Sequence, residues 1–175
     1  DNGTLSEISI APVAGSVDEG DPAQFQISLT RALAPGVGPL TVSYVVEGTV
    51  AAEDYSATPA VVFPDDGVTL IATLDIPTAE DLVVARPNEV HTVRLSGPTT
   101  GQVTVAAAPA NTASVTIADN DWRITTTATE NGTITPLGET IVNTGDNITF
   151  DLTWDYAIEA PAGVEVEDAL VQDLE

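Results

Sequence analysis

Short runs of alternating apolar and polar residues fill the first two thirds of the chain, separated by turns rich in Gly, Pro and Asp. Residues 23–29 read Ala-Gln-Phe-Gln-Ile-Ser-Leu, so an extended chain places its apolar side chains on one face and its polar side chains on the other. Residues 40–46 repeat this period of two. No long helical pattern occurs, and the sequence therefore predicts an all-β protein.

Seven strands are predicted before residue 121. They cover residues 7–11 with 15–17, 23–29, 40–46, 61–63, 68–76, 89–96, and 103–107 with 113–117. Pro12 and Pro109 divide the first and the last strand into two pieces each. Val68 and Leu70 are expected to face inward. Seven short strands with these spacings are typical of an antiparallel, immunoglobulin-like Greek-key sandwich, which we expect over residues 1–121.

Acidic residues gather at one pole of this expected sandwich. Successive antiparallel strands reverse direction, so the first, third and fifth connections share a pole with the exit from the last strand. These segments hold Asp18 and Glu19, Glu53 and Asp54, Glu80 and Asp81, and Asp119 and Asp121. Two of the three connections at the opposite pole carry no carboxylate. The acids are therefore concentrated where the chain leaves the sandwich.

A new pattern begins at Trp122. Short strands are predicted at residues 122–128, 132–135, 139–142 and 147–154, and Asn131-Gly132 is a strong hairpin signal. Residues 164–171 fit either a strand or a short helix. We expect a second, small β-rich domain at residues 122–175. Its size is near the lower limit for an independent core, so it is either incomplete or supported by the first domain.

The overall charge excludes several classes of partner. The 175 residues carry a net charge of −23, with four arginines and no lysine or cysteine. Nucleic acid and anionic membrane surfaces need basic patches, and insertion into a membrane needs a long apolar run that this sequence does not contain. Without cysteine, neither disulfides nor thiolate metal sites are possible. The acidity fits a solvated, salt-adapted surface or a surface partly neutralised by divalent cations.

Asp119-Asn120-Asp121 is the sharpest candidate for a cation site. Alternate residues of an extended chain project to the same side, so the two carboxylates can bind the same cation. Calcium takes six to eight oxygen ligands from flexible loops, whereas magnesium needs stricter octahedral geometry. Zinc is disfavoured in a chain with no Cys and one His. The composition leaves two interpretations open, a calcium site and a solvated acidic face.

Residues 15–121 resemble the Calx-β domain. The matching segments are Val17-Asp18-Glu19-Gly20, Val42-Ser43-Tyr44, Gly48-Thr49-Val50-Ala51 with Asp54-Tyr55, Val62-Phe63-Pro64-Asp65, Val93-Arg94-Leu95-Ser96, and Val115-Thr116-Ile117-Ala118-Asp119-Asn120-Asp121. Their order and spacing fit this family throughout. The resemblance implies a seven-stranded sandwich that binds Ca²⁺ at the acidic pole.

The resemblance also implies a set of calcium ligands. These are Glu19, Asp54, Glu80, Asp81, Glu89, Asp119 and Asp121. Residues 78–89 depart from the family, which usually has a run of acids there. Apolar residues and Arg86 replace several of these acids. Fewer or weaker sites are therefore expected than in the strongest calcium sensors of the family.

Residues 122–171 resemble a bacterial surface repeat of the internalin B-repeat or β-grasp-like kind. The resemblance rests on residues 131–138, then Val142, Gly145-Asp146, Phe150 and Tyr156. We expect the final strands of such a repeat to be missing from residues 122–171. This resemblance implies a surface-protein context and not an activity.

The remaining chemical side chains favour packing over catalysis. His91 is in phase with Val93 and Leu95, so we expect a core histidine with a satisfied hydrogen bond. Trp154 shares an apolar face with Phe150 and is expected to pack in a core, and Trp122 is expected to pack between the domains. No nucleophile elbow or other catalytic motif occurs, so we expect no enzyme activity.

The sequence leads to one main functional hypothesis and two alternatives. The main hypothesis is a calcium-binding structural or adhesion module of a larger bacterial surface or secreted protein, in which calcium rigidifies the pole between the domains. Its partners would be calcium ions, neighbouring domains of the same chain, and a surface glycan or protein receptor. The first alternative is a carbohydrate-binding accessory module of a polysaccharide-active protein. The second is a metal-free acidic spacer.

Overall fold

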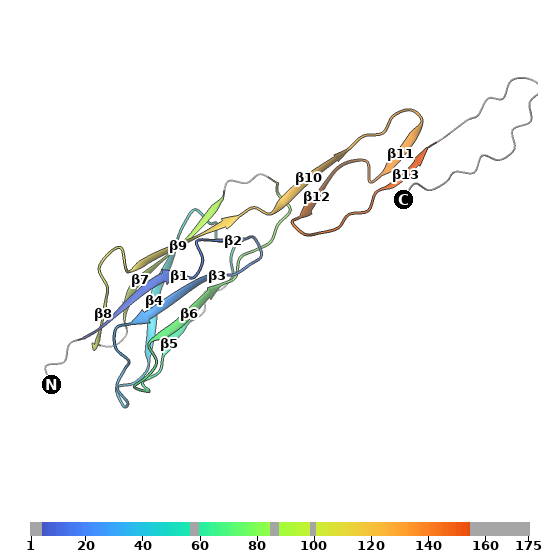
Figure 1. Ribbon diagram of the computed structural model, residues 1–175. Coiled ribbons are helices and arrows are strands. Elements are labelled where there is room, and N and C mark those ends of the chain that lie inside the picture. The colour runs from blue at the N-terminus through green and yellow to red at the C-terminus, as the bar shows by residue number, and fades with distance from the viewer. Residues whose placement is uncertain (1–4, 57–59, 85–87, 99–100, 155–175) are drawn as a thin grey trace, which may run out of the picture. The chain divides into compact units, whose positions relative to one another are not determined.

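The chain is all-β, which confirms the predicted fold class. The computed structural model describes residues 5–56, 60–84, 88–98 and 101–154 (Figure 1). Contacts divide the chain into two compact units, Asp1–Trp122 and Arg123–Glu175, and each is described here by itself. Among the described residues, no helix has the length and apolar character needed to span a membrane.

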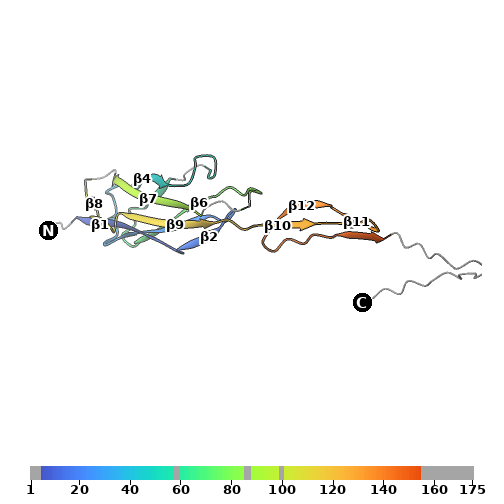
Figure 2. The same cartoon turned by 90° about the horizontal axis from the view of Figure 1, so that it is seen from above.

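The first unit is a sandwich of two sheets (Figure 1). Its strands are β1 (Ser6–Pro12), β2 (Ser16–Asp18), β3 (Ala23–Leu29), β4 (Leu40–Gly48), β5 (Val61–Phe63), β6 (Ile71–Ile76), β7 (Glu89–Pro98), β8 (Val103–Val105) and β9 (Thr112–Ala118). One sheet has the order β6-β3-β1-β8 and the other the order β2-β9-β7-β4-β5. In Figure 2 the strands of this unit lie along nearly the same axis.

The first and the last predicted strands are each shared between the two sheets. β1 pairs with β3 and β8 in one sheet, whereas β2 pairs with β9 in the other. Pro12 and Pro109 lie at these crossings, because a proline cannot donate to a continuing ladder. Seven predicted strands thus become nine segments, and the pairs β1–β8 and β2–β9 are parallel. The chain consequently leaves β9 at the pole where β2 ends, as the sequence predicts.

The core fills the space between the two sheets. Phe25 on β3 is fully buried and lies opposite Leu74 of β6, which is also fully buried. Leu33, from the connection between β3 and β4, joins this core. The other core residues follow the same alternation and come from every strand of this unit except β2: Ile8, Ile10, Ala23, Ile27, Leu29, Leu40, Val42, Val61, Phe63, Ile76, Val93, Leu95, Val103, Ala113, Val115 and Ile117. This burial is the main favourable contribution to the stability of the sandwich.

The start of β6 differs from the prediction. The strand begins at Ile71. Val68 is 75% exposed and Leu70 is 43% exposed, so neither faces inward as predicted. Asp66 accepts hydrogen bonds from the N–H groups of Val68 and Thr69 at 2.9 and 2.8 Å, which holds this segment in a turn. The alternation at the start of residues 68–76 therefore predicted a strand wrongly, because the side chain of Asp66 takes up the backbone N–H groups of this segment.

His91 faces the core between the sheets. It is fully buried, as predicted, but among the described residues neither of its ring nitrogens has a hydrogen-bond partner. The expected satisfied hydrogen bond is therefore absent there. The ring of Tyr55 meets it edge-on, with centroids 5.0 Å apart. Burial lowers the pKa of His91, although the charge of Asp54 opposes this shift. The imidazole therefore packs in its neutral form.

The second unit has no comparable core among its described residues. It consists of β10 (Asp121–Thr126), which starts at the end of the first unit and pairs with β12 (Gly138–Asn143), and of β11 (Gly132–Thr135), which pairs with β13 (Asp151–Trp154). Trp154 is 62% exposed, so its predicted packing in a core is wrong. Trp122 is 63% exposed. The element expected at residues 164–171 lies outside the described residues.

Replacing Phe25 with Ala tests the core of the sandwich. The change leaves a cavity at a fully buried site, and we expect the free energy of unfolding to fall by about 3–5 kcal/mol. Urea unfolding of the purified chain measures this loss. Gln26→Ala, on the exposed face of the same strand, is the matched control and is expected to change stability by less than about 0.5 kcal/mol. Equal effects of the two changes would contradict this core.

Candidate metal centre

The turn after β2 brings Glu19 to the exit of β9. Asp18 is paired with Ala118 across the parallel β2–β9 ladder, and the N–H of Glu19 donates to the carbonyl of Ala118 at 3.0 Å. Gly20 then reverses the chain with a φ of 80°, a conformation that glycine adopts without strain. A Cβ at Gly20 would lie 2.5 Å from Oε2 of Glu80, so the turn also leaves room for that carboxylate.

The exit from β9 is held by its own side chains. Oδ1 of Asp119 accepts the N–H of Asp121 at 2.9 Å, which curls the backbone of this segment. Nδ2 of Asn120 donates to the carbonyl of Glu19 at 3.1 Å and lies 3.5 Å from Oε2 of Glu80. Asn120 thus ties the exit to the β2–β3 turn and the β6–β7 segment. In the sequence, Asn120 is recognisable only as the residue between two acids.

The segment between β6 and β7 supplies the third group of acids. The hydroxyl of Thr78 donates to the carbonyl of Asp21 at 2.8 Å, which anchors the segment to the β2–β3 turn. The N–H of Ala79 donates to the carbonyl of Asp54 at 2.7 Å. Oδ1 of Asp81 accepts the N–H of Val83 at 2.7 Å. These contacts position Glu80 and Asp81 beside the two segments described above.

Three carboxylates converge at this point. Glu19, Asp81 and Asp121 each offer an oxygen, and these oxygens all lie within 4.8 Å of one another. Asp121 is only 7% exposed. Among the described residues, both side-chain oxygens of Asp121 and Oε2 of Glu19 are buried and without a hydrogen-bond partner. Buried carboxylate oxygens are costly unless a proton, a donor or a cation satisfies them.

The electrostatics of the cluster reflect this crowding. Burial raises the pKa of Glu19 to about 7, and the charges of Asp81, Asp119, Glu80 and Asp121 add to the shift. Burial likewise raises the pKa of Asp121, together with the charges of Asp119 and Asp81. The N–H of Val83, which is donated to Asp81, opposes the shift at Asp121 only in part. Both carboxylates are therefore in an environment that disfavours their charged form.

The structure brings together some of the ligands implied by the sequence. Glu19, Asp81 and Asp121 form the cluster, and Glu80 and Asp119 lie close enough to act on Glu19. The remaining two candidates are not part of the three-residue cluster. Asp54 contacts the β6–β7 segment through its backbone carbonyl, and its charge acts on His91. Glu89 begins β7, where it is paired with Ile117. Arg86 lies outside the described residues.

The donor set suits a hard divalent cation. All groups in the cluster are carboxylates, and calcium and magnesium both prefer oxygen ligands. Two oxygens bound to one calcium ion at about 2.4 Å can be separated by up to about 4.8 Å, which the present spacing allows. The three carboxylates come from separate loops, and calcium tolerates such irregular geometry better than magnesium does. The partnerless oxygens of Glu19 and Asp121 fit such an ion.

Two solved structures share this fold. The chain is similar to the apo-form Calx CBD1 domain, with 22% identity and a TM-score of 0.52, over 66% of this chain and 98% of that one. It is also similar to CBD12 from CALX1.2, with 16% identity and a TM-score of 0.51, over 85% of this chain and 74% of that one. At these identities the likeness concerns the fold, and it confirms the Calx-β-like fold expected from the sequence motifs.

CBD12 of CALX1.1, described as a calcium binding domain, aligns with 16% identity and a TM-score of 0.48 over 83% of this chain and 74% of that one. No protein-family model matches the sequence. No curated protein matches it either. The resemblance of residues 122–171 to an internalin B-repeat or β-grasp-like module stays a prediction.

The raised pKa of Glu19 predicts a pH dependence for the protein without calcium. Between its ordinary pKa of 4.5 and about 7, the folded chain holds a proton on Glu19 that the unfolded chain has lost. The contribution of Glu19 to the free energy of unfolding therefore falls as the pH rises through this window. Asp121 acts in the same direction. Urea unfolding at a series of pH values, in the presence of a chelator, measures the slope.

Glu19→Gln should flatten this dependence, because glutamine does not titrate. Glu7→Gln is the control, since it removes one acid from the exposed face of β1. If the free energy of unfolding of Glu19→Gln depends on pH as steeply as that of the parent protein, burial and neighbouring charges do not raise the pKa of Glu19.

Proposed function

We propose that the first unit is a calcium-binding module, in which Glu19, Asp81 and Asp121 hold the ion. The observation that supports this proposal is the convergence of three carboxylates, in which, among the described residues, both side-chain oxygens of Asp121 and Oε2 of Glu19 are buried without a hydrogen-bond partner. Glu80 and Asp119 lie beside the site and add negative charge. A divalent cation turns the repulsion among these groups into attraction, and this change stabilises the folded chain.

A shared proton is the main competitor of the ion at this site. The pKa of Glu19 is about 7, so a proton is held there in neutral or acidic solution. A proton neutralises one carboxylate, whereas calcium satisfies oxygens from all three segments at once. At pH 8, above this pKa, Glu19 is mostly unprotonated, so calcium meets little competition from protons.

Calcium bound here fixes the way in which the chain leaves the sandwich. Asp121 is a ligand and is also the first residue of β10, directly before the boundary at Trp122. Without the ion, repulsion loosens the exit of β9 from the β2–β3 turn. With the ion, the β2–β3 turn, the β6–β7 segment and the exit from β9 form one rigid pole. The role of calcium in this proposal is structural, and we assign no catalysis to the module.

The module belongs to a larger bacterial surface or secreted protein, in which it acts in structure or adhesion. Support comes from the acidic chain of net charge −23 and from the resemblance of residues 122–171 to bacterial surface repeats. The expected partners are calcium ions and neighbouring domains of the same protein, with a glycan or protein receptor at the cell surface. An acidic surface of this strength stays soluble outside the cell.

Calcium should stabilise the protein against heat and urea. One ion bound at a free concentration of one hundred times its Kd raises the free energy of unfolding by about 2.7 kcal/mol. Differential scanning calorimetry with calcium or with a chelator at pH 8 measures the change in Tm. An unchanged Tm would reject calcium binding and favour the metal-free acidic spacer.

The change in Tm caused by Asp121→Asn tests whether Asp121 is a calcium ligand, because a ligand should change the Tm in opposite directions with and without calcium. In the presence of a chelator, the change removes one repelled charge and should raise the Tm. In the presence of calcium, it removes a ligand and should lower the Tm relative to the parent protein. Glu7→Gln, the matched control on β1, should have the same small effect under both conditions. Effects of equal sign at Asp121 would contradict a role as ligand.

Terbium provides a direct probe of the site. Terbium binds at calcium sites, and an indole close to the ion sensitises its luminescence. Trp122 directly follows Asp121, so excitation of the tryptophans should produce terbium emission that calcium competes away. Trp122→Phe should remove most of this emission and leave the calcium-induced rise in Tm intact. Emission that survives in Trp122→Phe would place the bound ion elsewhere.

A further inference from the structure

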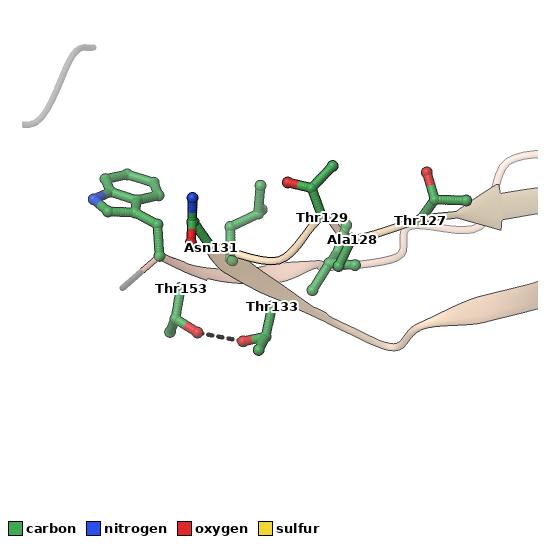
Figure 3. A pocket seen from close by; sticks show the side chains of 10 residues that line it. Thr127, Ala128, Thr129, Asn131, Thr133 and Thr153 are labelled. Carbon is green, nitrogen blue, oxygen red and sulfur yellow. Dashed lines mark hydrogen bonds between the residues drawn. The ribbon is translucent and has the colours of Figure 1, made fainter. Parts of the chain in front are cut away.

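A small cavity lies in the second unit, apart from the acidic cluster. It has a volume of about 280 Å³ and is formed by β11, β13 and the connection that leads into β11 (Figure 3). All the described residues that line it are uncharged. In a chain with a net charge of −23, this neutrality is informative, because it disfavours both cations and anions as ligands. The volume is just below the roughly 300–1,000 Å³ of typical small-molecule sites.

An exposed indole forms one wall of the cavity. Trp154 is 62% exposed and is paired with Gly132 across the β11–β13 ladder. Because glycine has no side chain, the face of the sheet beside the indole is open at this pair. The next pair on the same face is Ile134 with Leu152, and it provides an apolar floor. Both an aromatic surface and the space next to it are therefore present.

Polar side chains lie on the same side of the sheet as the indole. Thr133 and Thr153 share a hydrogen bond on the opposite face, since side chains alternate along a strand. In Figure 3, Asn131 and Thr129 point to the side opposite this pair. The amide of Asn131 can donate two hydrogen bonds and accept two, and the hydroxyl of Thr129 can do both.

This combination fits a neutral sugar. One face of a sugar ring consists of C–H groups that stack on an aromatic surface, and its edge carries hydroxyls that pair with amides and hydroxyls. An apolar peptide side chain would contact the indole but would make no use of the hydrogen-bonding groups of Asn131 and Thr129. A charged ligand would find no opposite charge in the lining. The cavity has room for one or two sugar units, on the scale of small-molecule sites.

We propose that this cavity binds a neutral sugar unit of a glycan, which stacks on Trp154 and forms hydrogen bonds with Asn131 and Thr129. Among the described residues, no carboxylate lines the cavity, so we expect this binding to be independent of calcium. The site is separate from the cluster of Glu19, Asp81 and Asp121, and neither proposal depends on the other.

The test uses the full chain with Trp122→Phe, in which Trp154 is the only tryptophan. Its fluorescence is followed while cellopentaose, xylopentaose, mannopentaose or chitopentaose is added in the presence of a chelator. At least one of these neutral glycans should give a saturable change. By calorimetric titration, the affinity should fall at least about tenfold in Trp154→Ala and less in Trp154→Phe, which keeps an aromatic ring.

Two further variants keep the result interpretable if Trp154→Ala is poorly folded. Thr129→Val keeps the shape of the side chain and removes its hydroxyl, and it should weaken binding several-fold. Trp122→Ala is the matched control, because it removes an indole of similar exposure, 63%, outside the cavity, and it should leave the affinity unchanged. Asp121→Asn should also leave it unchanged, which separates this site from the calcium site.

Several results would overturn the proposal. One is the absence of a saturable change with all four glycans. Another is binding that Trp154→Ala and Thr129→Val do not weaken, which would place the sugar elsewhere. A third is emission typical of a buried indole from Trp154 without ligand, which would mean that another part of the protein covers the cavity. Binding that disappears with the chelator would assign it to the metal centre instead.

Discussion

The short parallel ladder between β2 and β9 is the constraint on which the acidic pole depends. It pairs Asp18 with Ala118, so two segments about one hundred residues apart in sequence end side by side. The chain then has to place Glu19 next to Asp119 and Asp121, whatever their charges. The amide of Asn120 fastens this arrangement by its hydrogen bond to the carbonyl of Glu19. The repulsion among the acids is thus a consequence of strand pairing and not of an accidental surface composition.

The fold was largely predictable from the sequence, because the sandwich obeys a period of two. β3 buries Ala23, Phe25, Ile27 and Leu29, as the alternation indicates. The same rule failed where local chemistry competed with it, at Asp66, which captures the N–H groups of the predicted strand start. It also failed at Trp154, whose strand has no second layer over it among the described residues. Alternation predicts which side chains share a face, but it does not predict whether anything covers that face.

The sequence predicted the end of the sandwich at which the acids gather better than it predicted which of them form the cluster. Strand parity indicates which loops meet, and it correctly brings Glu19, Asp81 and Asp121 to one end. It cannot distinguish a carboxylate that joins the three-residue cluster from one that does not, such as Glu89 at the start of β7. Hydrogen bonds between loops decide this, and the bridging role of Asn120 depends on contacts that no local pattern shows. The Asp-Asn-Asp spacing was the available signal, since a short amide between two acids can reach neighbouring backbone carbonyls.

The direction of the β2–β9 pairing also determines how the sandwich resists mechanical tension. A pull that acts on the start of β1 and on β10 draws β2 and β9 in opposite directions along their common axis. In a parallel ladder, such a pull loads all hydrogen bonds in shear at the same moment, whereas an antiparallel hairpin pulled from its open end would unzip one bond at a time. The β2–β9 pair is therefore arranged to resist tension along the chain, and the acidic pole lies at the end of this ladder.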